Sequence, residues 1–311
     1  MSTKLAVVMD PITSINPPKD TTLAIMLEAQ RRGWEIYVLE QSDLWLLDGT
    51  VFARTDRVTL HDSSEHWFDI NEELIAELAE FDIILMRKDP PFNTEYIYTT
   101  YLLELAEAKG VKVFNKPQSL RDANEKLFAA WFPQCTPPTL VTRNAQQLRE
   151  FIHNHSDAVL KPLHGMGGGS IFRLQQHDPN INVVIETLTE NGATTIMAQK
   201  FLPEIAQGDK RIIMINGEPI PYALARIPKP GEIRGNLAAG GTGVGVELSD
   251  HDRWICSQVG PTLRDKNLTL VGLDVIGDYL TEINVTSPTC VREIEKIYSI
   301  NICAQFLDAI S

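Results

Sequence analysis

Short apolar runs alternate with amphipathic segments over the first 120 residues. The apolar runs predict β-strands at 5–9, 34–39, 81–86 and 111–114. Helices are predicted at 20–32, 72–80 and 94–109. Parallel strands need crossover connections, and helices supply them, so this alternation predicts an α/β fold whose N-terminal part is a doubly wound, largely parallel sheet. Ligands of such sheets bind beyond the carboxyl ends of the strands.

The pattern changes near residue 120 to shorter strands that are joined by turns. We predict strands at 158–161, 170–174, 195–199, 211–215 and 219–226. Asn216-Gly217 is a strong hairpin turn between the last two strands. Ser119 is predicted to cap a helix that extends to about residue 131, and Asn144 to cap a helix that ends at His155. The second half is therefore expected to combine antiparallel sheet with helices.

Composition narrows the class of protein. The chain has 311 residues, which suggests two domains, and 28 basic against 41 acidic residues give a formal net charge of −13. This surplus of negative charge argues against nucleic acid as the main partner. No apolar run approaches the roughly 18 residues that a bilayer crossing requires, and the first residues lead directly into a strand pattern. The four cysteines are scattered, so we expect a reduced, cytoplasmic protein.

A glycine-rich loop directly follows a predicted strand. Residues 161–170 read KPLHGMGGGS, a sequence that lacks the ending of a Walker A loop and is followed by no helix. Glycines let backbone N–H groups approach an anion closely, although a flexible hairpin would have the same composition. Lys161 favours the phosphate interpretation because it places a positive charge beside the loop.

A second glycine-rich segment, 228–245, shows no helix or strand periodicity. Long segments of this kind in compact domains are usually functional lids or disordered linkers. This segment contains Arg234 and Asn236 among small residues and lies within a strand-rich region. We therefore predict a lid that closes over a substrate.

Three oxygen-bearing side chains occur in a predicted hairpin near the C-terminus. Asp274 lies within an apolar strand, and Glu282 and Asn284 lie on one face of the next. Oxygen donors without histidine or thiolate suit Mg²⁺, whereas solvent exposure would explain Glu282 and Asn284 but not Asp274. An unbulged two-residue turn would place Asp274 and Glu282 on opposite faces. We therefore predict a three- or five-residue loop, or a bulge, between the strands.

Arg87 follows a predicted strand at the edge of the N-terminal sheet where ligands bind. Its guanidinium could hold a substrate carboxylate, or it could form an ion pair with Asp89. The sequence leaves these two possibilities open.

Taken together, these segments resemble the bacterial glutathione synthetases of the ATP-grasp superfamily, almost from end to end. The similarity is densest at 8–12, 85–91, 115–122, 124–127, 165–168, 208–211, 235–241 and 281–289. The last of these segments, TEINVTSPT, is the most specific. His164 and Gly169 depart from the family pattern. Both lie in the first glycine-rich loop, where we expect them to alter its stiffness.

The resemblance implies an N-terminal Rossmann-like domain at 1–122 and an ATP-grasp domain at 123–311. The ATP-grasp domain would consist of two α+β subdomains, about 123–200 and about 201–311, whose antiparallel sheets sandwich ATP. A homotetramer, no membrane partner and no nucleic-acid partner are also expected.

The resemblance also implies roles for individual residues. Nucleotide contacts are expected from Lys126, Lys161, Gly165, Met166, Gly167, Gly168, Gln199, Lys200, Phe201, Leu202 and Asp209. Mg²⁺, or Mn²⁺ in its place, would be held by Asp274, Glu282 and Asn284. Arg211 and Arg226 would face the reacting carboxyl group. Substrate contacts are expected from Arg87, Arg234, Asn236, Ser287, Pro288 and Thr289.

The implied reaction joins γ-glutamylcysteine to glycine, with ATP converted to ADP and phosphate through an acyl phosphate. Two alternatives remain open from the sequence. One is another ATP-grasp ligase, of the peptide or D-alanine ligase type. The other is a nucleotide-binding regulatory protein without turnover, which would bind ATP but release no phosphate.

Overall fold

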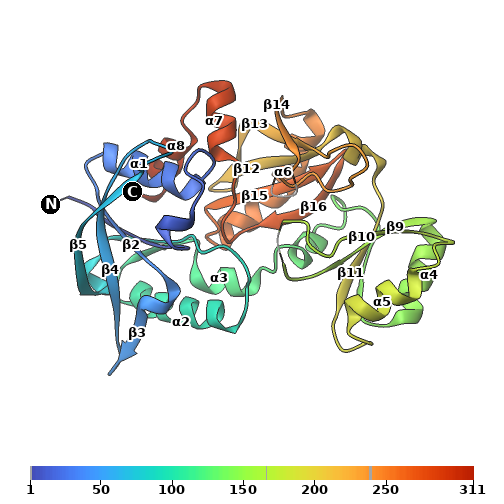
Figure 1. Ribbon diagram of the computed structural model, residues 1–311, viewed down its shortest axis with the longest axis horizontal. Helices are drawn as coiled ribbons and strands as arrows, with labels where there is room; N and C mark the ends of the chain where they lie inside the picture. Colours follow the sequence, from blue (N-terminus) through green and yellow to red (C-terminus); the bar gives the residue numbers. More distant parts are fainter. Residues whose placement is uncertain (1, 166, 238–239) are drawn as a thin grey trace.

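The computed structural model describes residues 2–165, 167–237 and 240–311 of the chain. It contains a seven-stranded, a four-stranded and a five-stranded sheet, which follow one another along the sequence. The seven-stranded sheet lies at the end of the molecule that contains both termini, the four-stranded sheet lies at the opposite end, and the five-stranded sheet lies between them (Figure 1). The α/β fold class is confirmed.

The centre of the seven-stranded sheet is parallel, as predicted. Its parallel strands, in spatial order, are β2 (Glu35–Leu39), β1 (Lys4–Val8), β6 (Ile83–Met86) and β7 (Lys112–Phe114). Antiparallel strands extend it beyond β2: β4 (Thr50–Leu60), β3 (Leu44–Leu47) and β5 (Phe68–Glu77). The helix predicted at 72–80 is therefore wrong. Pairing with β4 along the whole of β5 overrides the helix propensity of its Glu-Glu-Leu sequence, and only 78–80 form a 3₁₀ turn.

Both faces of this sheet are covered, and alternate residues of β1 contact different helices. Leu5 and Val7 belong to the core that contains α1 (Thr21–Arg31) and α8 (Ile302–Ile310). Ala6 and Val8 belong to the core that contains α2 (Thr94–Ala108). This two-sided burial explains why β1 is a continuous apolar run. It also confirms the doubly wound arrangement.

The helix predicted from Ser119 to about residue 131 is divided into two. α3 (Pro117–Asp122) begins at a proline, which is favourable in the first turn of a helix, and a 3₁₀ segment, Leu127–Trp131, follows. Ser119 therefore lies inside α3, where its hydroxyl donates to the carbonyl of Lys266. The break between the two helical segments contains Glu125 and Lys126.

The four-stranded sheet has one apolar face. Its strands, in spatial order, are β10 (Phe172–Gln175), β9 (Asp157–Pro162), β11 (Ile196–Lys200) and β8 (Thr139–Thr142). Leu160 and Ala198 face a core that is completed by α4 (Ala145–His155) and α5 (Ile181–Thr189). Asn144 caps α4 as predicted, because its side chain accepts from two backbone N–H groups. Residues that alternate with this core, such as Lys161, lie on the opposite face.

The five-stranded sheet is entirely antiparallel. Its strands, in spatial order, are β14 (Thr242–Glu247), β13 (Glu218–Ile227), β12 (Asp209–Ile215), β15 (Leu270–Ile276) and β16 (Tyr279–Asn284). Asn216-Gly217 forms the predicted turn, with φ of +48° and +76°. One face packs on α6 (Asp250–Asp265). Arg211 and Asp274, which are paired across β12 and β15, lie on the opposite face.

The hairpin of β15 and β16 contains the predicted bulge. Ile276 pairs with Tyr279 across a two-residue turn, and the register then shifts between Val275 and Asp274. Asp274 consequently lies opposite Glu282, and Gly272 opposite Asn284. The bulge thus brings the two carboxylates to one face, as the magnesium hypothesis requires.

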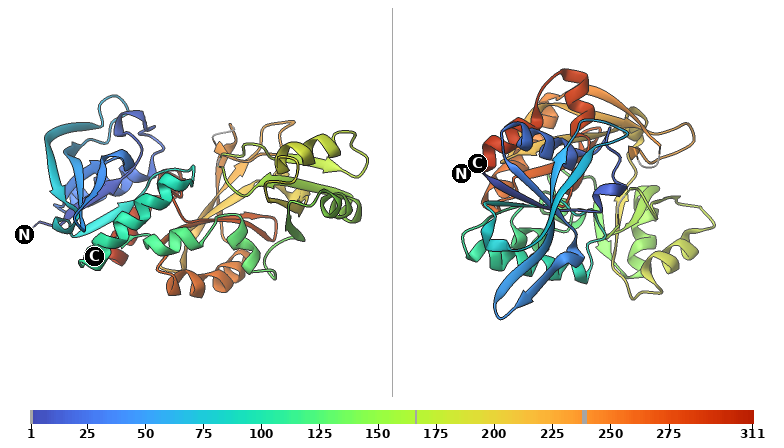
Figure 2. Two further views of the ribbon diagram at one scale, coloured as in Figure 1. Left: turned by 90° about the horizontal axis from the view of Figure 1, so that it is seen from below. Right: turned by 60° about the vertical axis from the view of Figure 1, so that its left-hand side comes forward.

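The C-terminal segment returns to the N-terminal sheet. α7 (Val291–Tyr298) and α8 follow the five-stranded sheet in sequence, but Phe306 and Leu307 of α8 share a core with Leu23 and Met26 of α1. Figure 2 shows the end of the chain beside its beginning. No helix in the described part of the chain is long and apolar enough to cross a membrane.

Candidate active site

A cavity of about 390 Å³ lies between the four-stranded and five-stranded sheets. Most of the residues that the sequence singled out line it: Lys126, Lys161, Gly165, Gly167, Gly168, Gln199, Lys200, Phe201, Leu202, Asp209, Arg211, Arg226, Arg234, Asn236, Asp274, Glu282, Asn284, Ser287 and Thr289. Arg87 and Pro288 do not line this cavity, and Met166 lies outside the described residues. One chamber therefore collects groups from segments that are more than 150 residues apart in the chain.

Asp274 is held by two arginines on the floor of the cavity. Arg211 donates from Nε and Nη2 to the two carboxylate oxygens, at 2.6 and 3.1 Å, and Arg226 Nη2 lies 2.9 Å from Oδ2. Burial opposes ionisation of Asp274, but the two guanidinium groups outweigh it and hold the pKa of the carboxyl well below its usual range. The protein itself thus supplies positive charge that offsets the cost of burying the Asp274 carboxylate.

Gly272 makes room for this arrangement. A Cβ atom at this position would lie 2.8 Å from Cδ of Arg211 and 3.1 Å from Cβ of Pro288. Glycine inside a strand usually weakens the strand, and close approach of another group is a common reason for its presence. Here it lets the Arg211 side chain lie flat against β15.

Asp209 extends the network beyond Arg226. Its Oδ2 accepts from Arg226 Nη2 at 2.5 Å, whereas Oδ1 is buried and has no hydrogen-bond partner within the described residues. Burial raises the pKa of Asp209 to about 7, with Arg226 opposing the rise and Asp274 adding to it. A carboxylate with one unsatisfied buried oxygen is suited to accept a hydrogen bond from a ligand in the cavity.

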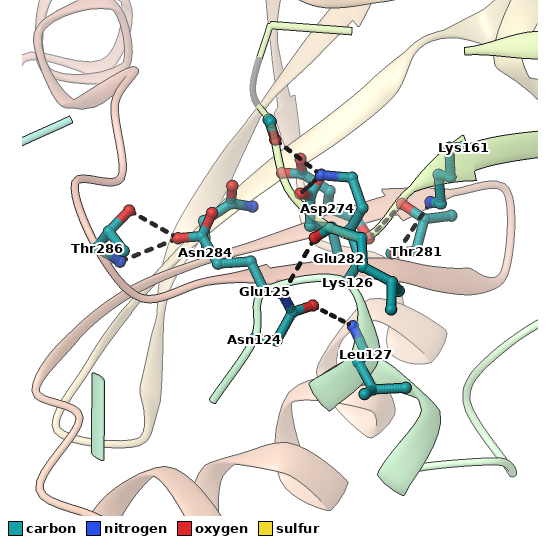
Figure 3. A network of polar contacts seen from close by, with 12 residues as sticks. Asn124, Glu125, Lys126, Leu127, Lys161, Asp274, Thr281, Glu282, Asn284 and Thr286 are labelled. Carbon is teal, nitrogen blue, oxygen red and sulfur yellow. Dashed lines mark hydrogen bonds and ion pairs between the residues drawn. The ribbon is translucent and has the colours of Figure 1, made fainter. Parts of the chain in front are cut away.

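Two buried lysines approach the cavity from different elements. Lys126 Nζ lies 3.0 Å from Oε1 of Glu282 and donates to the carbonyl of Gly165 (Figure 3). Lys161 Nζ donates to the carbonyl of Thr281 at 3.4 Å, and no carboxylate within the described residues forms an ion pair with it. Burial lowers the pKa of Lys161 to about 8, although Glu282 opposes this effect. An anion in the cavity would restore the partner that Lys161 lacks.

The three predicted metal ligands are close together, and their donors fit a hard cation. Asp274 and Glu282 are opposite one another, and Asn284 lies two residues further along β16. Nδ2 of Asn284 donates to Gly272, which turns its amide group so that the carbonyl oxygen is left for a ligand. The same strand pair therefore supplies three oxygen-bearing side chains, although both oxygens of Asp274 also contact arginines.

Residues 199–202, which are predicted to contact the nucleotide, lie at and beyond the C-terminal end of β11, an inner strand of the four-stranded sheet. Gln199 is buried, and its Nε2 donates to Oγ1 of Thr139 on the neighbouring strand. Lys200, Phe201 and Leu202 continue along the cavity wall, and Arg173 stacks on the ring of Phe201 at 3.7 Å. Phe201 and Leu202 give this part of the wall an apolar surface, which is suited to a flat, planar ligand.

The two glycine-rich segments meet at the cavity. Gly168 has a φ of +79°, and a Cβ atom there would lie 2.7 Å from Oδ1 of Asn236 and 3.1 Å from Cδ of Arg234. Arg234 is itself held by Glu232 at 2.5 Å. The predicted lid is shorter at its C-terminal side than expected, because β14 begins at Thr242, while 238–239 lie outside the described residues. The described part of the lid contacts the glycine loop.

Arg87 lies in the wall of a neighbouring cavity of about 330 Å³, which is also lined by Asp20, Ser287 and Thr289. It is buried and donates to Oγ1 of Thr22 and to the carbonyl of Pro288. No ion pair joins Arg87 to Asp89, both of which belong to the described residues. Arg87 therefore contacts the predicted substrate segment through the backbone of Pro288.

Sequence reasoning missed Glu125. Its Oε1 accepts hydrogen bonds from Val285 N, Thr286 N and Thr286 Oγ1, and the residue lines the cavity. Burial raises the pKa of Glu125, and Glu282 adds to the rise. The only available signal was its place beside Lys126, because its partners lie 160 residues further along the chain.

A histidine pair also lies outside the predicted site. His61 and His66 each hydrogen-bond to Asp69, at 2.8 and 2.9 Å, in the exposed loop between β4 and β5. The atoms lie close enough together to hold a metal ion. The two hydrogen bonds account for the arrangement without one, and these residues are not part of the cavity lining.

Two family models match the chain. The N-terminal domain of prokaryotic glutathione synthetase matches residues 3–121, and the ATP-grasp domain of prokaryotic glutathione synthetase matches residues 125–299. The chain belongs to the prokaryotic glutathione synthetase family. The family resemblance noted in the sequence is therefore confirmed.

Two relatives named glutathione synthetase match this chain over nearly its full length. The glutathione synthetase of Vibrio vulnificus (strain CMCP6) is 58% identical over 307 residues, which cover 99% of this chain and 97% of that protein. The glutathione synthetase of Pseudomonas syringae pv. tomato is 59% identical over 310 residues, which cover 100% of this chain and 97% of that protein.

Solved structures confirm the ATP-grasp fold. The D-cycloserine synthetase DcsG superposes with a TM-score of 0.68 at 15% identity, covering 98% of each chain. The D-alanyl-alanine synthetase A of Vibrio cholerae gives a TM-score of 0.63 at 13% identity, covering 99% of this chain and 97% of that one. At these identities the likeness concerns the fold alone.

Proposed function

We propose that this member of the glutathione synthetase family joins γ-glutamylcysteine to glycine and converts ATP to ADP and phosphate. Family membership supports the reaction class, and the cavity supports the chemistry. The observation that carries the proposal is the meeting of Lys126, Lys161, Arg211 and Glu282 in one chamber beside a glycine loop. Lys161 comes from the four-stranded sheet, Arg211 and Glu282 come from the five-stranded sheet, and Lys126 comes from the segment that precedes both sheets.

The reaction needs an activated carboxyl group. The cysteinyl carboxylate of γ-glutamylcysteine attacks the γ-phosphorus of ATP, and the bond from that phosphorus to the bridging oxygen breaks to leave ADP. The product is an acyl phosphate. The amine of glycine then attacks its carbonyl carbon, loses a proton, and phosphate leaves as the amide forms. The protein contributes position and charge, and no covalent intermediate on the protein is needed.

The lysines would contact the nucleotide phosphates. Lys126 is held between Gly165 and Glu282, so its ammonium group already lies beside the glycine loop. Lys161 is poised on the opposite wall without a carboxylate partner among the described residues. Backbone N–H groups of Gly165, Gly167 and Gly168 would complete this anion site, to which the predicted contact of Met166 also belongs.

Arg211 would stabilise the negative charge that develops on the reacting carboxyl. Its bonds to Asp274 use Nε and Nη2 and hold the guanidinium plane fixed, so that Nη1 is left for the substrate oxygen. Arg226 is fixed in the same way between Asp209 and Asp274. Preorganised donors of this kind need little rearrangement during the reaction.

Asp274, Glu282 and Asn284 would hold Mg²⁺, or Mn²⁺ in its place. The metal would offset the charge of the nucleotide phosphates when it is bound. Arg234 and Asn236, which lie against Gly168, would help to close the chamber, because an acyl phosphate must be protected from water. Ser287 and Thr289 would face the peptide substrate, with Pro288 and Arg87 behind them.

The test is mass detection of the product formed from ATP, Mg²⁺, γ-glutamylcysteine and glycine. Glutathione should form together with one phosphate per peptide bond. Phosphate release with D-alanine or with other dipeptides, but not with this pair, would instead assign a related ligase. ATP binding without phosphate release from any pair would assign a regulatory protein. The expected tetramer can be checked by light scattering on the same sample.

A further inference from the structure

The segment between α3 and the following 3₁₀ turn, residues 123–126, contributes Glu125 and Lys126 to the lining of the cavity. Asn124 begins the turn, because its Oδ1 accepts from Leu127 N and its carbonyl accepts from Phe128 N. Its Nδ2 also donates to the carbonyl of Leu163, just before the glycine loop. Lys126 then points to Gly165 and Glu282. Glu125, between them, points the other way.

Three donors converge on one oxygen of Glu125. The N–H group of Val285 lies 2.9 Å from Oε1. The N–H group and the hydroxyl of Thr286 lie 3.0 and 2.8 Å from it (Figure 3). The backbone carbonyl of Glu125 also accepts from Ile283 N at 2.9 Å. Glu125 therefore binds the chain at the point where β16 ends and the loop to α7 begins.

This loop joins two functional groups of residues. Asn284, the last residue of β16, is a predicted metal ligand, and Ser287 and Thr289 line the cavity as predicted substrate contacts. Val285 and Thr286 lie directly between them and form no ladder bonds with β15, whose pairing ends at Asn284. Glu125 therefore helps to set the direction of the chain beyond Asn284. Asn115 donates to the carbonyl of Val285 at 2.8 Å, and Arg87 donates to the carbonyl of Pro288, so these two residues hold the loop at other points.

We propose that Glu125 is a positioning residue that aligns the substrate loop, residues 285–289, with the nucleotide lysine at position 126. It acts through the backbone of Val285 and Thr286. An ionised carboxylate is suited to this task, because it accepts several hydrogen bonds at once and strengthens each of them. The adjacent position of Lys126 makes the alignment direct, because consecutive residues of one backbone segment contact the substrate loop and the glycine loop. The role rests on the proposed function.

Replacement of the carboxylate should weaken use of the peptide substrate more than it weakens nucleotide binding. In Glu125→Ala, two backbone N–H groups and one hydroxyl lose their acceptor, and kcat/KM for γ-glutamylcysteine should fall roughly 10- to 100-fold. The Kd for ATP, measured without the peptide substrate, should change less than about threefold because Lys126 keeps its own bonds. Glu125→Gln retains an acceptor oxygen of the same reach, so it should recover part of the loss.

Glu186→Ala is the matched control. Glu186 is an exposed glutamate on α5, away from the cavity lining. This variant should behave as the unchanged protein in both measurements. A purely structural role of Glu125 would instead lower ATP affinity, peptide use and thermal stability together, with no recovery in Glu125→Gln, and that result would overturn the proposal.

Amide hydrogen exchange provides a readout that does not depend on turnover. Val285 and Thr286 should be protected in the unchanged protein and in Glu186→Ala, and should exchange at least tenfold faster in Glu125→Ala. Equal exchange in all three proteins would overturn the positioning role even if the protein makes no glutathione. Conversely, faster exchange with no glutathione formed by the unchanged protein would leave the alignment standing and overturn the proposed function.

Discussion

The two sheets that enclose the cavity differ in whether their buried charged groups form ion pairs. On the five-stranded sheet, Arg211, Arg226, Asp209 and Asp274 are buried and already paired with one another. On the four-stranded sheet, Lys161 is equally buried but has no carboxylate partner within the described residues. The ion pairs of the five-stranded sheet therefore form before any ligand binds, whereas the four-stranded sheet carries a positive charge that a phosphate would satisfy.

This difference separates two ways in which a protein stabilises charge in a catalytic cavity. The five-stranded sheet, which we call the paired wall, fixes the orientation of its arginines, because each guanidinium is hydrogen-bonded to a carboxylate. The four-stranded sheet, which we call the unpaired wall, gains an electrostatic interaction only when an anion binds. The free-energy cost of burying the Lys161 charge is therefore offset by ligand binding. Variants of each wall should therefore have distinct effects.

The largest effect is expected from Arg211→Ala. The rate of glutathione formation should fall roughly 100- to 1000-fold, because the developing negative charge on the reacting carboxyl loses its fixed donor. Binding of ATP should remain largely intact, since Arg211 contacts Asp274 and not the glycine loop. Steady-state kinetics and nucleotide titration measure the two quantities.

Arg264→Ala is the control for this variant, because Arg264 forms an exposed ion pair with Glu218 and neither residue lines the cavity. It should retain the full rate. Equal losses of rate and of ATP affinity in Arg211→Ala would show that Arg211 only maintains the structure of the paired wall.

Asp274→Asn should cause the largest change in stability. It leaves Arg211 and Arg226 buried without their shared anion, and the free energy of unfolding should fall by about 3–5 kcal/mol. Asp157→Asn breaks the ion pair with Arg173 on the four-stranded sheet, where the side chains are 24% and 36% exposed. Its cost should be about 0–1 kcal/mol. Urea unfolding of both variants makes the comparison, and equal costs would contradict it.

Lys161 should make ATP binding sensitive to alkaline pH. Its pKa is about 8 in the ligand-free protein, below the usual value for lysine, and phosphate should raise it on binding. The ammonium form is lost as the pH rises above this value, so ATP affinity should fall by up to about tenfold per pH unit.

The lowered pKa of Lys161 has the opposite effect on the stability of the folded protein. Because the unfolded chain binds the Lys161 proton more tightly, stability contributed by this site should increase between pH 8 and the usual lysine pKa of about 10.4. Lys161→Arg stays charged throughout and should bind ATP with little pH dependence. A steep dependence that persists in this variant would assign the titration to another group.

The smallest effect should come from Gly168→Ala compared with Gly165→Ala. Both glycines have positive φ, at +79° and +104°, so both variants carry backbone strain. Only the methyl group at position 168 would meet Asn236 of the lid, since among the described residues that are not its chain neighbours none lies within 4 Å of the corresponding point at Gly165. Glutathione formation should be a few-fold slower in Gly168→Ala than in Gly165→Ala, and equal rates would argue against contact between the lid and the glycine loop during turnover.

Local patterns predicted several elements well. The continuous apolar run at 5–9 corresponds to β1, and Asn216-Gly217 forms the expected turn. The spacing of Asp274 and Glu282 led to the predicted bulge, because side-chain direction in a strand depends only on position and register. These features depend on interactions between residues that are close in sequence.

Other features depend on partners that the local pattern does not contain. The segment at 72–77 has helical composition but forms part of β5, because β4 offers a full set of backbone hydrogen bonds. Glu125 has no distinctive local context, yet its acceptor oxygen is used by residues 285 and 286. The local pattern likewise does not indicate the pairing of Asp274 with Arg211, because that pairing requires β12 and β15 to be neighbouring strands.

By itself, the sequence determined the types of chemical group available: two lysines, two arginines, three oxygen donors and two glycine-rich segments, on elements whose periodicity shows which face each side chain takes. The tertiary structure alone decided which of those charges neutralise one another and which remain for a ligand. The physical reason is that the energy of a buried charge depends on the distance to its nearest partner, and those distances are set by strand order and by the place of Glu125 and Lys126 in the lining of the cavity.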